Sequence, residues 1–444
     1  MRCLGRNKDF KRCKSRGTPF ACRHHRLQVL TFFISSFLAI VTIVGTMASL
    51  SIFQKISELF EATTLPTETI TINIGILLPE NEYYGRKLFN GIKLAKKEFQ
   101  AEHKDVVINF CCENDYSNVD STITGFDRLL KENVVAIIGS ADSHCAYESI
   151  ELANKNKIPF LTPLATAQFD LSKNEYFFRA VMTDVAMIEE LISWMVAKYP
   201  HKIYPIIHED QLFGKSAHDV AKKILINKNY SSYPIQYCRD TAVDSIDMAV
   251  ELILTDLKNY QKAHGRPEAI AIVGRSTETV LIVEAIKKIY PKIPLFAQFP
   301  DYHFYNKRLD IEEYYTVCAH INEYYLMINY ENIDILSERL RKFVAAYKSE
   351  YRDEETPDKH GAYGYDCGNV LFDAILRAKY KNIKNFKEEN MQKIRNNIRE
   401  EILLTPESRR GIMTDGGFDN YKFSNSSVPK LTYSNRRLII RSEE

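Results

Sequence analysis

Short apolar runs alternate with amphipathic segments along most of the chain. In the first cycle, an apolar run at 70–78 precedes a segment at 86–101 whose apolar residues recur at helical spacing, and a second apolar run follows at 106–111. Short apolar runs predict buried strands, whereas a period near 3.6 residues predicts surface helices. Buried strands that alternate with such helices are typical of a parallel sheet covered on both faces, so the pattern predicts an α/β fold.

This alternation is repeated in two successive sets, one on each side of Pro200. The first set adds strands at 134–138 and 159–162 and helices at 119–133, 145–156 and 184–199; the second has strands at 202–208, 233–237, 269–273 and 294–297 and helices at 215–227, 244–261 and 277–289. Two such sets predict two doubly wound parallel-sheet lobes of similar architecture. A β-type run at 315–321, helices at 333–351 and 361–380, and hairpin strands at 411–419 and 430–440 complete the pattern.

The N-terminal part of the chain has a different pattern. Residues 27–54 contain no charged side chain, and this segment is long enough for a helix that crosses a bilayer. Residues 1–26 hold nine Lys or Arg and a single acidic residue, Asp9. We expect a single-pass transmembrane signal anchor at 27–54, with the basic tail in the cytoplasm, a stalk at 55–69 and the globular part outside. The alternative is a cleaved signal peptide, for which residues 46–48 offer a small-x-small site before Ser49.

Charge and composition narrow the class of protein. Hydrophobic residues make up 45% and charged residues 26% of 444 residues, which suits a protein with two globular domains rather than a disordered chain. The net charge is +2, and because residues 1–26 alone carry +8, the rest of the chain carries −6 and is mildly acidic. A mildly acidic surface argues against nucleic acid as the main partner.

The cysteines and the search for catalytic motifs give little indication of reactive or metal-binding chemistry. Nine cysteines are too few and too scattered for a scaffold built on disulfides. Cys111, Cys112 and Cys145 follow two strands that we expect to be neighbours, which predicts one disulfide between Cys145 and Cys111 or Cys112. The sequence has no zinc-finger spacing, H-E-x-x-H, Walker A or G-x-S-x-G motif, so we expect no metal, no cofactor and no enzyme activity.

Two of the predicted strands end in turns that carry hydroxyl groups. The run at 134–138 is followed by Gly139 and Ser140, and the run at 159–162 leads into a turn that ends at Thr166. The carboxyl ends of parallel strands lie along one edge of a sheet, where hydroxyls and unpaired backbone amides can hold a ligand. We therefore expect a small polar ligand at this edge.

Several short motifs, in order along the chain, resemble type I periplasmic binding proteins of the Leu/Ile/Val-binding kind. They are Ile74-Gly75-Ile-Leu-Leu-Pro79, Tyr84-Gly85, Asn90-Gly91-Ile-Lys-Leu-Ala95, Val135-Ala-Ile-Ile-Gly139, Pro159-Phe-Leu-Thr-Pro-Leu-Ala-Thr166, Phe178-Arg179, Phe213-Gly214-Lys215 and Tyr365-Asp366. The resemblance implies two lobes joined by three crossovers, near Pro200, 318–321 and 406–411, which close on a solute. Lobe 1 would comprise 70–200 and 320–410, and lobe 2 would comprise 201–319 and 411–444.

The resemblance also implies a set of ligand-binding residues. On lobe 1, the Ser143 hydroxyl, or alternatively Ser140, and the turn of Leu164, Ala165 and Thr166 would hold the solute's carboxylate and ammonium. The alternative for Thr166 is that it only caps the turn.

On lobe 2, the matching positions are Phe213 and Arg275, and Arg275 points to an anionic group. Phe299 stands where an acidic residue is expected, which leaves Asp301 as the candidate partner for an ammonium group.

The resemblance therefore implies a membrane-anchored extracytoplasmic solute-binding protein for ABC-type uptake. Its solute would be small and carboxylate-bearing, such as a branched-chain amino acid or a relative, and its partner a membrane permease. We expect it at the cell inner membrane, with the globular part in the periplasm or outside the cell. The alternative is a ligand-sensing or regulatory ectodomain that acts on a partner membrane protein.

Overall fold

A computed structural model describes most of the chain after residue 68. The described residues are 69–238, 245–274, 276–299, 311–328, 337–352, 356–380, 390–405, 411–413, 418–419, 422–423, 429–434 and 437–440. All of them belong to one compact unit, Thr69–Glu444. No helix within these ranges is both long and apolar enough to cross a membrane. The tail, the anchor at 27–54 and nearly all of the stalk lie outside the described residues.

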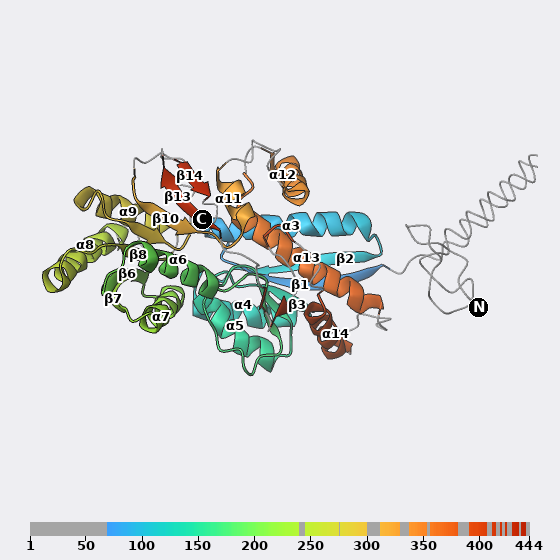
Figure 1. Cartoon of the computed structure of the whole chain (residues 1–444). Helices are drawn as coiled ribbons and strands as arrows, with labels where there is room; N and C mark the ends of the chain where they lie inside the picture. The colour runs from blue at the N-terminus through green and yellow to red at the C-terminus, as the bar shows by residue number, and fades with distance from the viewer. Residues whose placement is uncertain are drawn as a thin grey trace, which may run out of the picture. The chain divides into compact units, whose positions relative to one another are not determined.

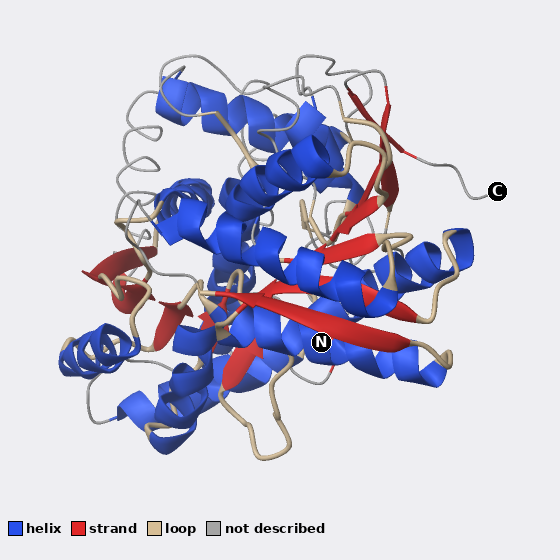
Figure 2. Ribbon diagram, turned by 90° about the vertical axis from the view of Figure 1, so that its left-hand side faces the viewer, coloured by secondary structure: helices blue, strands red, loops and turns tan. Residues whose placement is uncertain are grey.

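The first sheet is built mainly from the N-terminal strands, and β1 lies inside it. Its order is β11-β12-β5-β4-β3-β1-β2, and β1 to β5 pair in parallel. The strands are β1 (Ile70–Leu77), β2 (Val106–Glu113), β3 (Ala136–Gly139), β4 (Phe160–Thr162), β5 (Phe177–Arg179), β11 (Phe418–Asp419) and β12 (Lys422–Phe423). Helices cover both faces of this sheet (Figure 2). They are α3 (Tyr83–Glu102), α12 (Glu338–Tyr351), α13 (Lys359–Tyr380) and α14 (Met391–Leu403) on one side and α4 (Val119–Lys131) and α5 (Ser143–Lys155) on the other.

The second sheet repeats this plan. Its order is β14-β13-β10-β9-β8-β6-β7, with β6 to β10 parallel and β13 and β14 antiparallel at one edge. The strands are β6 (Ile203–Glu209), β7 (Ser231–Tyr237), β8 (Ile270–Val273), β9 (Leu295–Ala297), β10 (Tyr314–Val317), β13 (Lys430–Ser434) and β14 (Arg437–Ile440). The helices around it are α6 (Asp184–Lys198), α7 (Leu212–Asn227), α8 (Ser245–His264) and α9 (Ser276–Ile289), and α11 (Ile321–Ile328) follows β10. The predicted α/β class with parallel sheets is confirmed.

The chain crosses between the two sheets at places that differ in part from the prediction. Helix α6, which we assigned to lobe 1, packs its buried side chains Met187, Leu191 and Met195 against the second sheet, so the first crossover lies before α6 and not near Pro200. Strands β11 and β12, which we assigned to lobe 2, belong to the first sheet, where β12 pairs with β5. The last crossover therefore lies between β12 and β13.

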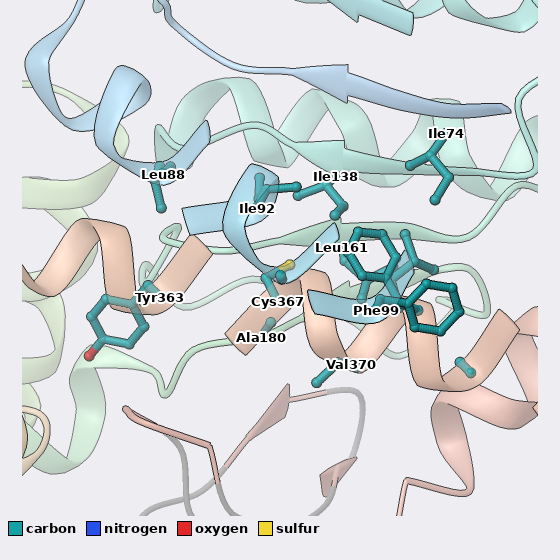
Figure 3. Close-up of a cluster of buried hydrophobic side chains, with 14 of the residues drawn as sticks. Ile74, Leu88, Ile92, Phe99, Ile138, Leu161, Ala180, Tyr363, Cys367 and Val370 are labelled. Atoms are coloured by element: carbon teal, nitrogen blue, oxygen red, sulfur yellow. The ribbon is translucent and has the colours of Figure 1, made fainter. Parts of the chain in front are cut away.

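Helices α3 and α13 touch through their backbones. A Cβ atom on Gly91 would lie 1.9 Å from the Gly361 carbonyl oxygen, and one on Gly364 would lie 2.1 Å from the Leu88 carbonyl oxygen. Real atoms do not approach so closely, so only glycine allows this contact. Figure 3 shows the result, with Leu88 and Ile92 of α3 close to Cys367 of α13 in one buried cluster.

The predicted disulfide is wrong for this structure. Cys111, Cys112 and Cys145 are all free thiols. The prediction assumed that β2 and β3 are neighbours, but β1 pairs with both and separates them. Two strand spacings amount to about 10 Å, which exceeds the Cα separation that a disulfide spans.

The contact between α3 and α13 generates the first prediction. Gly91→Ala should lower the free energy of unfolding by about 1–3 kcal/mol, because the added methyl group forces the helices apart. This loss opposes the gain of about 1 kcal/mol that alanine normally brings to a helix. Urea denaturation followed by circular dichroism measures the difference. The matched control is Gly368→Ala on α13, whose new methyl group would lie 3.1 Å from the Ala95 side chain and no closer than 3.5 Å to any backbone atom of α3. Equal stability of the two variants would contradict the close contact.

Candidate functional site

A cavity of about 400 Å³ lies at the carboxyl ends of the parallel strands, and both sheets contribute to it. Its lining consists of Glu82, Tyr83, Tyr84, Ala141, Asp142, Ser143, Leu164, Thr166, Val181, Met187, Phe213, Glu278, Phe299, Ala319, Glu323, Lys359, His360 and Tyr363. First-turn residues of α3, α5, α7, α9, α11 and α13 are among them. The N-terminal end of a helix carries partial positive charge, so this arrangement favours a negatively charged group in the cavity.

The cavity brings together four of the seven predicted ligand-binding residues. Ser143, Leu164 and Thr166 line it from the first-sheet side, and Phe213 lines it from the start of α7. Ala165 is buried behind the same turn and is not part of the lining. Arg275 and Asp301 lie outside the described residues, so their part in a site stays a prediction.

A buried arginine holds the turn that carries Thr166. Arg179 at the end of β5 is only 1% exposed, and its guanidinium donates to the carbonyl oxygens of Ala165 (2.9 Å) and Ala167 (2.7 Å). The Ala165 amide donates to the Thr162 hydroxyl at 3.2 Å, and the Thr162 hydroxyl donates to the Ser140 carbonyl oxygen at 2.7 Å. The turn is therefore fixed by bonds to both neighbouring strands, which leaves Thr166 in a defined place at the cavity wall.

Asp184 links this turn to the second sheet. It is buried at the start of α6 and accepts a hydrogen bond of 2.7 Å from the Gln298 amide at the end of β9. Burial raises the pKa of Asp184 to about 7, although the Thr166 hydroxyl and the Arg179 guanidinium act in the opposite direction. A second hydrogen bond links the two sides of the cavity: the backbone amide of Gln168 donates to the Ser216 hydroxyl of α7 at 2.8 Å.

One side of the cavity is formed by polar residues that sequence reasoning missed. The hydroxyls of Tyr84, which lines the cavity, and of Ser117, which does not, both donate to the same oxygen of Asp142, each at 2.7 Å. Ser117 reaches this position because Tyr116 and Ser117 adopt left-handed conformations, with φ values of 51° and 53°. Tyr84 is part of the Tyr84-Gly85 motif, which predicts the family resemblance but no contact with a ligand, and no pattern in the sequence singles out Asp142.

A charged and aromatic group forms another side. The Lys359 ammonium lies 2.7 Å from a carboxylate oxygen of Glu323, and the other oxygen accepts the Ala319 amide at 3.0 Å. The same ammonium lies 4.8 Å from the centre of the Phe299 ring, which stacks on Phe213 with a centroid distance of 6.3 Å. Only Phe213 of this group was predicted, because Glu323 and Lys359 are distant in sequence and carry no motif.

The described lining therefore carries both signs of charge. Glu82, Asp142, Glu278 and Glu323 supply carboxylates, and Lys359 supplies a cation. Apolar and aromatic side chains separate these groups. A cavity of this kind can hold a small solute that carries a carboxylate, an ammonium group or both, together with an apolar part.

Comparison with known proteins agrees with this geometry. Residues 71–237 match the family model described as periplasmic binding protein. The fold is similar to a leucine-binding protein of Thermotoga maritima, with 19% identity, a TM-score of 0.63 and coverage of 84% of this chain and 98% of that one. It is also similar to a branched-chain amino acid transporter substrate-binding protein of Streptococcus pneumoniae in complex with isoleucine, with 19% identity, a TM-score of 0.62 and coverage of 83% and 97%.

Curated relatives include plant receptors. Glutamate receptor 2.9 of Arabidopsis thaliana is 29% identical over 130 residues, which cover 28% of this chain and 14% of the receptor. Glutamate receptor 2.8 of the same plant is 28% identical over 155 residues, which cover 33% of this chain and 16% of the receptor. The chain thus matches about a sixth of each receptor's length. Residues 71–237 therefore resemble the periplasmic binding protein family, and the fold of the chain is similar to that of Leu/Ile/Val-binding proteins.

Proposed function

We propose that the protein reversibly binds a small amino-acid-like solute in the cavity between the two sheets. The observation that carries this proposal is the convergence of helix N-termini, the Ser143 and Thr166 hydroxyls and acidic side chains on one cavity. Its volume of about 400 Å³ lies within the usual range for small-molecule sites. The solved relative in complex with isoleucine supports a solute of this size.

The polar groups suggest how such a solute would lie. Its carboxylate would meet the N-terminus of α5 and the hydroxyls of Ser143 and Thr166, where charge-assisted hydrogen bonds replace lost hydration. Its ammonium would meet Asp142 or Glu278, and Asp301 remains a further proposed partner for it. Phe213 and Leu164 would cover the apolar part. Arg275 remains a proposed contact for an anionic group.

We further propose that the protein delivers its solute to a membrane permease for ABC-type uptake. The solved proteins of similar fold support this role, since they include a branched-chain amino acid transporter substrate-binding protein. A charge-free segment at 27–54 after a basic tail supports anchoring at a cell inner membrane, with the binding unit in the periplasm or outside the cell.

Ligand sensing is the second candidate. The similarity of part of the chain to plant glutamate receptors favours it, because those proteins are named as receptors. In that case the binding unit would pass its occupancy to a partner membrane protein. Loss of solute uptake after deletion of the gene would favour delivery, whereas unchanged uptake would favour sensing.

The binding proposal predicts the effect of removing one hydroxyl. Calorimetry of residues 55–444 against amino acids, keto acids, amides and small dicarboxylates should identify a solute. Thr166→Ala and Ser143→Ala should then each weaken its binding about tenfold to a hundredfold, because each removes a charge-assisted hydrogen bond worth about 1.5–3 kcal/mol. The matched control is Thr255→Ala on α8, whose hydroxyl bonds only within its own helix turn and which should bind like the parent. Parent-like binding by Thr166→Ala and Ser143→Ala would show that this wall is only structural.

The anchoring proposal predicts a protease pattern. Protease added to intact cells or spheroplasts should digest the binding unit and leave a small membrane-bound N-terminal fragment, because the basic tail remains inside. Immunoblotting with a tag at the N-terminus measures that fragment. A released form that begins near Ser49 would instead support a cleaved signal peptide.

A further inference from the structure

The Lys359 ammonium occupies a well-formed cation site inside the cavity wall. Glu323 is 3% exposed at its side chain and holds the ammonium at 2.7 Å, while the Phe299 ring lies 4.8 Å from the same nitrogen. A carboxylate beside the face of an aromatic ring is a general arrangement for binding a primary ammonium group. The site holds Glu323 rigidly as well, because its second oxygen accepts the Ala319 amide.

The position of Lys359 in its helix makes this arrangement informative. Lys359 is the first residue of α13, where the partial positive charge of the helix end disfavours a cation. Helix stability therefore does not account for a lysine at this place. Glu323 and Phe299 offset the unfavourable interaction, and both belong to other segments of the chain that line the cavity.

We infer that Glu323 and Phe299 form a subsite for a primary ammonium group, which Lys359 fills as a tethered occupant. A cationic solute reaches this subsite only by displacing Lys359, whose side chain is 19% exposed and enters from the cavity wall. Lys359 is then a specificity residue, since it disfavours solutes whose ammonium points to this end of the cavity. The inference deepens the proposed function, because the subsite opens into the proposed solute cavity.

The test removes the Lys359 side chain and supplies a free amine in its place. Lys359→Ala leaves Glu323 buried without this cation and leaves room for a short alkylammonium ion. n-Butylammonium should raise the melting temperature of Lys359→Ala towards that of the parent, and calorimetry should give an affinity at least about tenfold higher than for the parent. 1-Butanol, which has similar length and no charge, should have little effect on either protein.

Two further variants separate the subsite from a simple cavity. Lys359→Met fills the same space without charge, so n-butylammonium should not stabilise it. Adding Glu323→Gln to Lys359→Ala removes the carboxylate, so the response to n-butylammonium should disappear. If Lys359→Ala is unfolded without the amine, recovery of its native circular dichroism with n-butylammonium is the expected result.

The inference is overturned if n-butylammonium neither stabilises nor refolds Lys359→Ala, or if the response is the same in the Glu323→Gln double variant. n-Butylammonium carries no carboxylate and so does not test binding of an amino-acid-like solute. A negative result here leaves the proposed function standing, and failure of the solute screen leaves the ammonium subsite standing.

Discussion

The direct backbone contact between α3 and α13 is the constraint on which the cavity depends. These helices are far apart in sequence, but they lie side by side along the first sheet (Figure 1) because Gly91 and Gly364 leave no side chain between them. The first residues of α3 include Tyr84, and the first residues of α13 include Lys359 and His360. The spacing of the two helices therefore sets the distance between two walls of the cavity. A wider separation would move Lys359 relative to Tyr84 even if every side chain in the lining were kept.

A set of hydrogen bonds connects α13 to residues 412–413 and, through them, to α11. Asp366 of α13 accepts the amides of Ile412 and Met413 at 2.8 and 2.7 Å, and the Asn322 side chain of α11 donates to the Ile412 carbonyl oxygen. α11 follows β10 of the second sheet, so these bonds join chain segments from both sides of the cavity. These hydrogen bonds would therefore resist movement of α11 relative to α13.

Much of the fold was predictable because its signals are local. Buried strands such as Ile270–Val273 are apolar at every position, and the helices between them have one apolar face, so the α/β class follows from periodicity. The position of Ser143 and Thr166 in the cavity lining was predictable because both follow strand ends and match the family motif. The disulfide, the placement of α6 and the pairing of β12 with β5 depend on which strands are neighbours, and periodicity carries no information on that. Tyr84, Asp142, Glu323 and Lys359 meet only through the tertiary fold, so no local pattern could have joined them into one cavity.

The burial of Asp184 has a consequence for the protons that accompany solute binding. Its pKa is raised to about 7 by burial, and it lies behind Thr166, where the carboxylate of a solute is proposed to bind. The negative charge of a bound carboxylate would raise the pKa of Asp184 further, because two like charges in a buried site disfavour ionisation. Capture of an anionic solute would then draw a proton from the solvent, and release would return it. Solute affinity and the acidity of the surrounding medium would be thermodynamically coupled through one buried carboxyl group.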